Sequence, residues 1–135
     1  MEWLENPDYA ELGARPNLGI PTGYRPVVSK VTLRAEIEGS DQRHLWAQID
    51  SNGDLVIAGQ DLGPSVEQFF GEREYEWAHT IKKQHIPQFL ELLNQDPGAN
   101  VMTVLQGYAG ERCDLVCDAI TAAADKFPIE FWSRF

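Results

Sequence analysis

Apolar and polar residues alternate strictly along residues 31–38, which is the pattern of a β-strand with one buried face. The apolar members of this set, which should share the buried face, are Val31, Leu33, Ala35 and Ile37. Alternation returns at residues 44–50, and an extended apolar run follows at residues 55–58. Asn52 and Gly53 lie between these two segments, and Asn-Gly tolerates the positive φ angles of a tight hairpin turn. The pattern therefore predicts three consecutive antiparallel strands.

Two more strands are predicted further along the chain, at residues 74–81 and 129–135, because alternation resumes in both segments. The glycine-rich segment 59–64, which follows the apolar run at residues 55–58, is expected to break the third strand. Ser65 can then cap a short helical turn that Gly71 ends. The strands together predict a β-meander of about four strands, completed by a C-terminal strand that returns to the sheet.

The apolar period becomes helical between residues 86 and 126. Pro87 opens the first predicted helix, Asn100 can cap the second, and the third covers residues 113–126. Strands followed by a run of helices indicate an α+β fold. We expect about three helices to cover one face of a mainly antiparallel sheet.

The first 30 residues differ from the rest because they show neither period and hold four of the eight prolines. Proline removes a backbone hydrogen-bond donor, so this segment should form an extended arm. Its apolar residues favour an arm that packs on the body of the protein, although docking on a partner is the alternative. Residues 31–135 are then one α+β domain.

The net charge of -10 is concentrated in the sheet region. Residues 36–76 contain ten acidic residues against Arg43 and Arg73, a net charge of -8. Such a surface repels nucleic acids and anionic lipids and attracts basic proteins. Solubility alone is the other explanation for the acidity.

The sequence also bears on where the protein acts. No stretch approaches the roughly 18 apolar residues of a membrane span, and the N-terminus has no signal-peptide pattern. Cys113 and Cys117 lie four residues apart on a helical pattern, which is no disulfide framework of a secreted fold. We therefore expect a cytoplasmic protein with reduced thiols and no membrane contact.

The sequence lacks the common motifs of catalysis, cofactor binding and metal binding. Neither a glycine-rich phosphate loop nor a G-x-S-x-G elbow occurs, so no catalytic residue and no cofactor is predicted. The histidines His44, His79 and His85 fall on different elements. Cys113 and Cys117 could supply two of the four ligands of a zinc site, but buried apolar positions explain them better, and no metal is predicted.

Four parts of the chain form a recognisable set, namely residues 54–63, Val66 with residues 69–71, residues 74–77 and residues 129–133. Together they resemble a family of small uncharacterised bacterial proteins. These segments include a GQDLG turn, an EYEW-like strand and an EFWS C-terminal segment. The family has no known activity, so the resemblance implies no catalytic or cofactor-binding residue.

The charge and the aromatics favour an interaction protein, and in particular an acidic inhibitor or immunity-type protein that masks a basic partner such as a bacterial toxin. The expected contacts are acids of the charged segment and aromatic residues on polar strand faces. These partner-binding candidates are Trp46, Asp50, Asp54, Asp61, Glu72, Glu74, Glu76 and Trp77.

The alternative is a ligand-binding domain or an enzyme of unfamiliar type. Its site would be a carboxylate-lined cleft, because crowded carboxylates raise one another's pKa. The residues that would line this cleft are Asp61, Glu74, Glu76 and His79.

Overall fold

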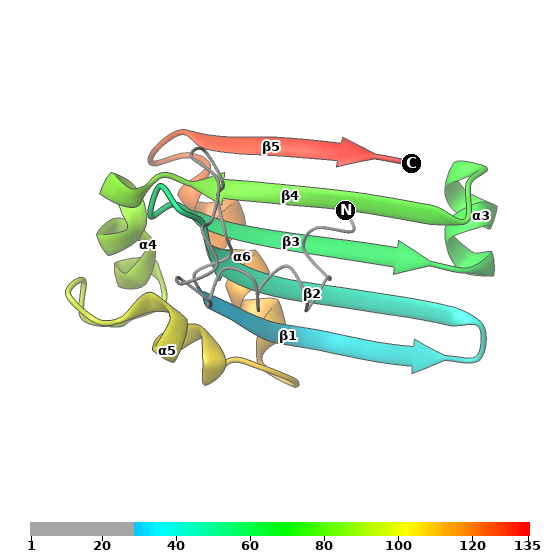
Figure 1. Ribbon diagram of the computed structural model, residues 1–135, viewed down its shortest axis with the longest axis horizontal. Coiled ribbons are helices and arrows are strands. Elements are labelled where there is room, and N and C mark those ends of the chain that lie inside the picture. The colour runs from blue at the N-terminus through cyan, green and yellow to red at the C-terminus, as the bar shows by residue number, and fades with distance from the viewer. Residues whose placement is uncertain (1–28) are drawn as a thin grey trace, which may run out of the picture.

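The computed structural model describes residues 29–135, which form an open, five-stranded antiparallel sheet with helices on one face (Figure 1). The strands lie side by side in chain order. They are β1 (Ser29–Glu38), β2 (Asp41–Ile49), β3 (Leu55–Leu62), β4 (Glu74–Ile81) and β5 (Ile129–Arg134). The predicted α+β class, the meander and the returning C-terminal strand are confirmed. The predicted N-terminal arm lies outside the described residues except for its last two, which begin β1.

The helices fall into two groups along the sheet (Figure 1). Three of them pack against one sheet face, and they are α4 (Ile86–Leu92), α5 (Val101–Gln106) and α6 (Cys113–Ala123). A short 3-10 helix, η2 (Lys83–His85), leads into α4. The remaining helix, α3 (Pro64–Phe70), lies at the opposite end of the sheet. Within residues 29–135, no helix has the length and apolar character that crossing a bilayer requires.

The hydrophobic core fills the space between the sheet and the three packed helices. Leu45, Leu55, Ile57 and Ile81 are fully buried on this side of the sheet. Helix residues meet them there, and the largest buried ones are Phe89, Leu90, Leu105 and Val116. We call this side the helix face and the other side, which no described helix covers, the open face. The predicted cap is confirmed, since Asn100 Oδ1 accepts hydrogen bonds from the amides of Met102 and Thr103 at 3.0 and 3.1 Å.

The strict alternation predicted for the first strand is wrong beyond Leu33. A β-bulge lies between Thr32 and Arg34, so that Thr32 pairs with Trp46 while Arg34 pairs with Leu45. One extra residue moves every following side chain to the other face. Ile37, predicted to lie with the core, is therefore 72% exposed.

The third strand is longer than predicted. Residues 59–62, expected to form a turn, continue β3 and pair with both neighbouring strands. Gly59 does not break the strand here. Gly59 lies on the helix face directly opposite Trp77, and it makes room for that ring in the site described next.

Candidate functional site

The described helices cover only half of the helix face, and the half that they leave uncovered carries a row of charged and aromatic side chains. Residues paired directly across antiparallel strands share a face. Glu36 pairs with Arg43, Arg43 with Asp61, and Asp61 with Tyr75, so these four side chains cross the sheet in one line. Glu36, Arg43 and Asp61 line a cavity together with residues of α3, so this line lies at the end of the sheet that holds α3 (Figure 1). The sheet therefore presents a polar and aromatic strip that the core helices do not bury.

Four rings form a continuous cluster at one side of this strip, and we call it the aromatic row. Its members are Phe70, Tyr75, Trp77 and Phe135. Tyr75 stacks on Phe70 and on Trp77 with ring centroids 5.4 Å apart in both pairs, and Phe135 lies 4.9 Å from Tyr75. Phe70 and Phe135 remain 55% and 57% exposed. Aromatic rings left accessible in this way mark surfaces that another molecule can cover.

Gly59 explains why the indole of Trp77 can lie against the sheet. A Cβ atom at Gly59 would meet Trp77 Cζ2 at 2.1 Å and two further ring atoms at 2.5 Å. Only glycine leaves room for the ring at this cross-strand position. Gly59 on β3 therefore makes room for the Trp77 ring on the neighbouring strand β4.

Helix α3 forms the far wall of the site, and the β1–β2 hairpin anchors it. Asp41 accepts hydrogen bonds from the Ser65 amide at 2.9 Å and from the Ser65 hydroxyl at 2.6 Å. These bonds lower the pKa of the Asp41 carboxyl. Ser65 was expected to cap the helix, but it lies inside α3, and Asp41 caps the helix from another element. Gly63, with φ of +120°, lets the chain pass close to the hairpin, where a Cβ would lie 2.5 Å from the Ser40 carbonyl oxygen.

A cavity of about 300 Å³ opens between α3 and the ends of β1, β2 and β3, and we call it the acidic cavity. Four carboxylates and one guanidinium line it, together with rings of α3; the charged residues are Glu36, Glu38, Asp41, Asp61 and Arg43. Phe70 belongs to both the wall of the acidic cavity and the aromatic row. The two features therefore make one continuous surface.

Asp61 is the half-buried charge of this surface. Burial raises the pKa of its carboxyl, although Arg43 and Arg34 partly oppose the shift. The Arg43 Nε lies 3.9 Å from Asp61 Oδ1, which is the outer limit of an ion pair. A second cation brought to this carboxylate would therefore stabilise its ionised form.

A second cavity, of about 470 Å³, lies between α6 and strands β2 to β5, and we call it the apolar cavity. His79 supplies its imidazole, and Cys117 and Thr121 of α6 face it among aliphatic and aromatic side chains. Burial lowers the pKa of His79 and raises the pKa of the Cys117 thiol, so both groups are neutral near pH 7. The buried Nδ1 of His79 has no hydrogen-bond partner among the described residues.

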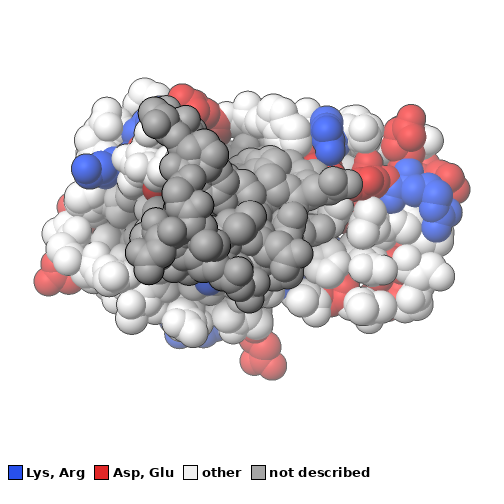
Figure 2. Space-filling model, viewed as in Figure 1, with Lys and Arg blue, Asp and Glu red and all other residues white. Residues whose placement is uncertain are grey.

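The sequence-predicted residues do not all gather at this site. Asp61 and Trp77 belong to it, and Glu72 is exposed in the loop that follows α3. Trp46, Glu74 and Glu76 lie on the open face, since they alternate with residues of the helix face. Figure 2 shows that open face, with acidic and basic side chains interspersed at the end that holds α3.

The three residues on the open face are held by local contacts. Trp46 is 4% exposed and packs on Ala58. Glu74 accepts a hydrogen bond from Gln60 at 2.7 Å, and buried Glu76 lies 3.6 Å from Arg134.

The cleft expected in the enzyme alternative does not form as predicted, because the sheet separates its residues. Asp61 and His79 point to the helix face, whereas Glu74 and Glu76 point to the open face. In a strand, neighbouring side chains alternate between faces, so closeness in sequence placed these carboxylates on opposite sides.

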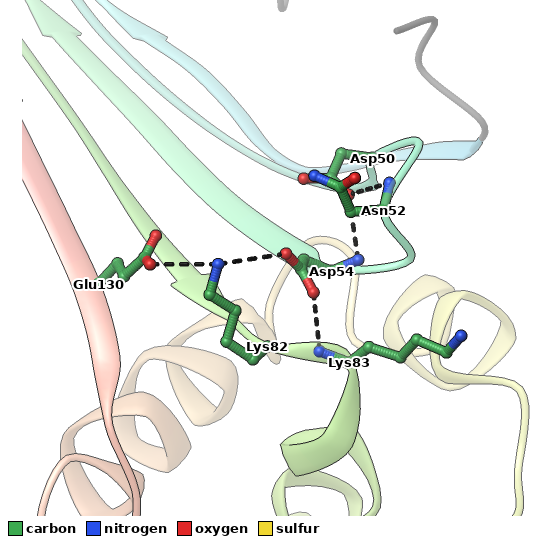
Figure 3. Close-up of polar contacts among 6 residues, drawn as sticks. All are labelled: Asp50, Asn52, Asp54, Lys82, Lys83 and Glu130. Carbon is green, nitrogen blue, oxygen red and sulfur yellow. Dashed lines mark hydrogen bonds and ion pairs between the residues drawn. The ribbon is translucent and has the colours of Figure 1, made fainter.

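Asp50 and Asp54 lie at the other end of the sheet, where they organise the β2–β3 turn (Figure 3). Asp50 accepts the amides of Asn52 and Asp54 at 2.8 and 3.1 Å. Asp54 is buried and accepts the Lys83 amide at 2.9 Å, and Lys82 lies 3.5 Å from its second oxygen. The contacts of both carboxylates are thus with the turn and the start of η2.

Several residues of the surface are not among those predicted from the sequence, namely Glu36, Glu38, Asp41, Arg43, Phe69, Phe70 and Phe135. The sequence did contain one signal for an exposed ring, because Phe69 and Phe70 are adjacent at the end of a seven-residue helix. A helix cannot bury two adjacent rings on the same side. Phe69 is indeed 78% exposed.

The segments on which the expected resemblance rests lie next to one another in the sheet. Residues 55–62, 74–77 and 129–133 lie on the adjacent strands β3, β4 and β5. Within residues 29–135, no three His, Cys, Asp or Glu side chains are grouped closely enough to hold a metal ion. No protein family, curated protein or solved structure matches the chain.

Proposed function

We propose that this chain is a non-catalytic, cytoplasmic interaction protein of the inhibitor or immunity type, which masks a basic partner such as a bacterial toxin. The observation that carries the proposal is the uncovered half of the helix face. There an exposed aromatic row adjoins a cavity lined by four carboxylates. The partner would lay an apolar segment on the rings and insert a cationic side chain into the acidic cavity.

The aromatic row supports this role because rings provide a large contact area at a small loss of side-chain entropy. Tyrosine and tryptophan are among the residues that dominate binding free energies at protein interfaces. Tyr75 and Trp77 lie at the centre of the row, and the exposed Phe70 and Phe135 flank them. A partner that covers the row removes these rings from water.

The acidic cavity supports a basic partner in particular. Its volume of about 300 Å³ is at the lower limit of sites for small molecules, and it suits the end of one long side chain. A guanidinium bound to Asp61 would make charge-assisted hydrogen bonds with a carboxylate that Arg43 reaches only at 3.9 Å. Complementary charge of this kind mainly accelerates association.

The test is a comparison of three variants with the wild-type chain. Asp61→Asn removes the half-buried charge, Tyr75→Ala removes the central ring, and Glu91→Gln is the control, because it changes the charge equally on an exposed position of α4. Each immobilised protein would be exposed to an extract of the native host, and retained proteins identified by mass spectrometry. A partner of this site is a basic protein that the wild-type and Glu91→Gln chains retain and the other two lose.

Affinities then follow by calorimetry with the purified partner. Asp61→Asn and Tyr75→Ala should each weaken binding by about tenfold or more, which corresponds to about 1.4 kcal/mol. Association should also slow as the salt concentration rises. Equal retention by all four proteins, or a partner without a basic surface, would contradict the proposal.

A small-ligand function is the second candidate, and the apolar cavity favours it. The cavity of about 470 Å³ holds one polar atom without a partner among the described residues, His79 Nδ1. Apolar cavities with few polar groups are typical of ligand sites. Native mass spectrometry of the purified chain tests this candidate. A bound small molecule that Ala124→Phe displaces by filling the cavity would favour it over protein binding.

A further inference from the structure

Strand β5 is an edge of the sheet (Figure 1), and two of its apolar side chains are exposed to solvent. Phe131 is 57% exposed and Trp132 is 41% exposed, and they lie on opposite faces of the strand. An edge strand also presents unpaired backbone N–H and C=O groups. Such an edge can pair with a strand of another chain.

The other edge of the sheet, β1, is protected against pairing. The bulge between Thr32 and Arg34 interrupts its regular backbone. The carbonyl of the bulge residue Leu33 is already bonded, since it accepts the Gly110 amide at 2.8 Å. Charged side chains, Glu36 and Glu38 among them, follow the bulge. Bulges, charges and covering loops are the means by which proteins keep edge strands from associating.

Strand β5 has neither a bulge nor a covering loop or helix in the described part of the chain, and its two charges, Glu130 and Arg134, have opposite signs. Its pairing with β4 is regular over six consecutive residues. No backbone hydrogen bond from a described loop or helix reaches it. The contrast between the two edges indicates that β5 is an interaction edge.

We propose that two copies of this chain form a dimer by antiparallel pairing of their β5 strands about a two-fold axis at Trp132. In this register, Trp132 lies opposite the partner copy's own Trp132, and Glu130 lies opposite Arg134 of the second copy. Phe131 lies opposite Ser133, and Ile129 opposite Phe135. The two five-stranded sheets then become one continuous sheet.

The sequence of β5 is complementary to itself in this register. Glu130 and Arg134 carry opposite charges at equal distances from Trp132, so the dimer gains two cross-strand ion pairs. Each would extend a pair within the chain, because Glu130 lies 3.1 Å from Lys82, and Arg134 lies 3.6 Å from Glu76. Moving the register by one pair of residues in either direction removes the Glu130–Arg134 pairing. The charges therefore select a single register.

The central contact of the dimer is apolar. The two Trp132 rings would lie on the open face about 5 Å apart at their Cβ atoms, where directly opposed side chains interact. On the helix face, Ile129 would contact Phe135, which is 57% exposed in the single chain. A partner copy thus covers the exposed rings of this strand without any change of fold.

Charge reversal tests the dimer and its register together. The full chain would be studied by sedimentation velocity from about 1 to 500 µM, and the wild type should show a monomer–dimer equilibrium. Glu130→Arg places arginines opposite each other, and Arg134→Glu places glutamates opposite each other. Each change should weaken dimerisation by about tenfold or more. Glu111→Arg, which alters the charge by the same amount at an exposed position before α6, should leave the equilibrium unchanged.

Mixing the two variants distinguishes a loss of charge pairing in the proposed register from a loss of structure in each variant. Both variants lose an ion pair within the chain, so either one alone could weaken dimers through altered structure. In an equimolar mixture, the two arginines of the Glu130→Arg strand face the two glutamates of the Arg134→Glu strand, and the heterodimer should form with nearly the wild-type affinity. The double variant with both changes should likewise recover the homodimer. A wild-type chain that stays monomeric to 500 µM, single variants that still dimerise fully, or a mixture that does not associate would each overturn the proposal.

Discussion

The contact between Gly59 and Trp77 gives the sharpest quantitative prediction on the fold of the site. Gly59→Ala would place a Cβ atom 2.1 Å from Trp77 Cζ2, whereas carbon atoms pack at about 3.5–4.0 Å. The indole must therefore move away from the sheet by about 1.5 Å. Displacing a ring in this way destabilises a fold by about 1–3 kcal/mol. Alanine offsets about 0.4–1 kcal/mol of this loss by restricting the unfolded chain.

The expected net effect is a loss of about 0.5–2 kcal/mol in the free energy of unfolding. The midpoint of thermal unfolding should fall by roughly 2–6 °C. In a chain that already carries Trp77→Ala, the overlap is absent, and Gly59→Ala should be neutral or slightly stabilising. The coupling between the two positions is then about 1–3 kcal/mol. Urea denaturation of the four proteins, followed by circular dichroism, measures it.

Gly39→Ala is the control for this cycle, because Gly39 has a positive φ of +63° and open space around its Cα. Its cost comes from the backbone alone, so it should be the same with and without Trp77. If Gly59→Ala lowered the free energy of unfolding equally in the wild-type and Trp77→Ala chains, the proposed overlap with the Trp77 ring would be refuted. A cost near zero in the wild-type background would refute it as well.

The carboxylates of the sheet should differ in how they affect stability. Burial raises the pKa of Asp61, so its ionised form opposes folding at neutral pH. Asp61→Asn should therefore raise the melting temperature at pH 7, and the gain should shrink as pH falls through that raised pKa and vanish below the ordinary value of 3.8. Hydrogen bonds from Ser65 lower the pKa of Asp41 below its ordinary 3.8, so Asp41→Asn should lower the melting temperature at pH 7, and the difference should disappear as pH falls through the lowered pKa. Melting curves from pH 2 to 8 check both signs, and parallel curves for wild type and variant would contradict either one. Asp54→Ala leaves the Lys83 backbone amide without its hydrogen-bond acceptor. Urea denaturation should therefore show a loss of about 1–3 kcal/mol in the free energy of unfolding. An unchanged denaturation midpoint would contradict the buried contact.

The sequence predicts the elements of this fold well because their signals are local. A period of two marks each strand, and caps such as Asn100 mark the start of a helix. The bulge in β1 has no local signal, since it depends on Gly110, which approaches Leu33 from the loop after α5. The failure of the alternation at Ile37 follows from this distant contact.

The composition of the site was less predictable, because it depends on register. The charge of residues 36–76 was visible in the sequence, but its distribution between faces was not. The pairing of Asp61 with Tyr75 brings one acid to the aromatic row, while Glu74 and Glu76 flank Tyr75 in the chain and point to the other face. Phe70 and Phe135 meet only because α3 and β5 come together at one end of the sheet.

The two proposed surfaces share one residue, and this sharing links their energetics. Phe135 belongs to the aromatic row through its contacts with Phe70 and Tyr75, and in the β5 dimer it lies opposite Ile129 of the second copy. A partner that binds the row therefore contacts a side chain whose surroundings depend on dimerisation. Thermodynamic linkage then requires that the partner change the dimerisation constant by the same factor by which dimerisation changes partner affinity. Equal partner affinity for the wild-type chain and for the monomeric Glu130→Arg variant would show that the two surfaces act independently, and unequal affinity that Phe135 couples them.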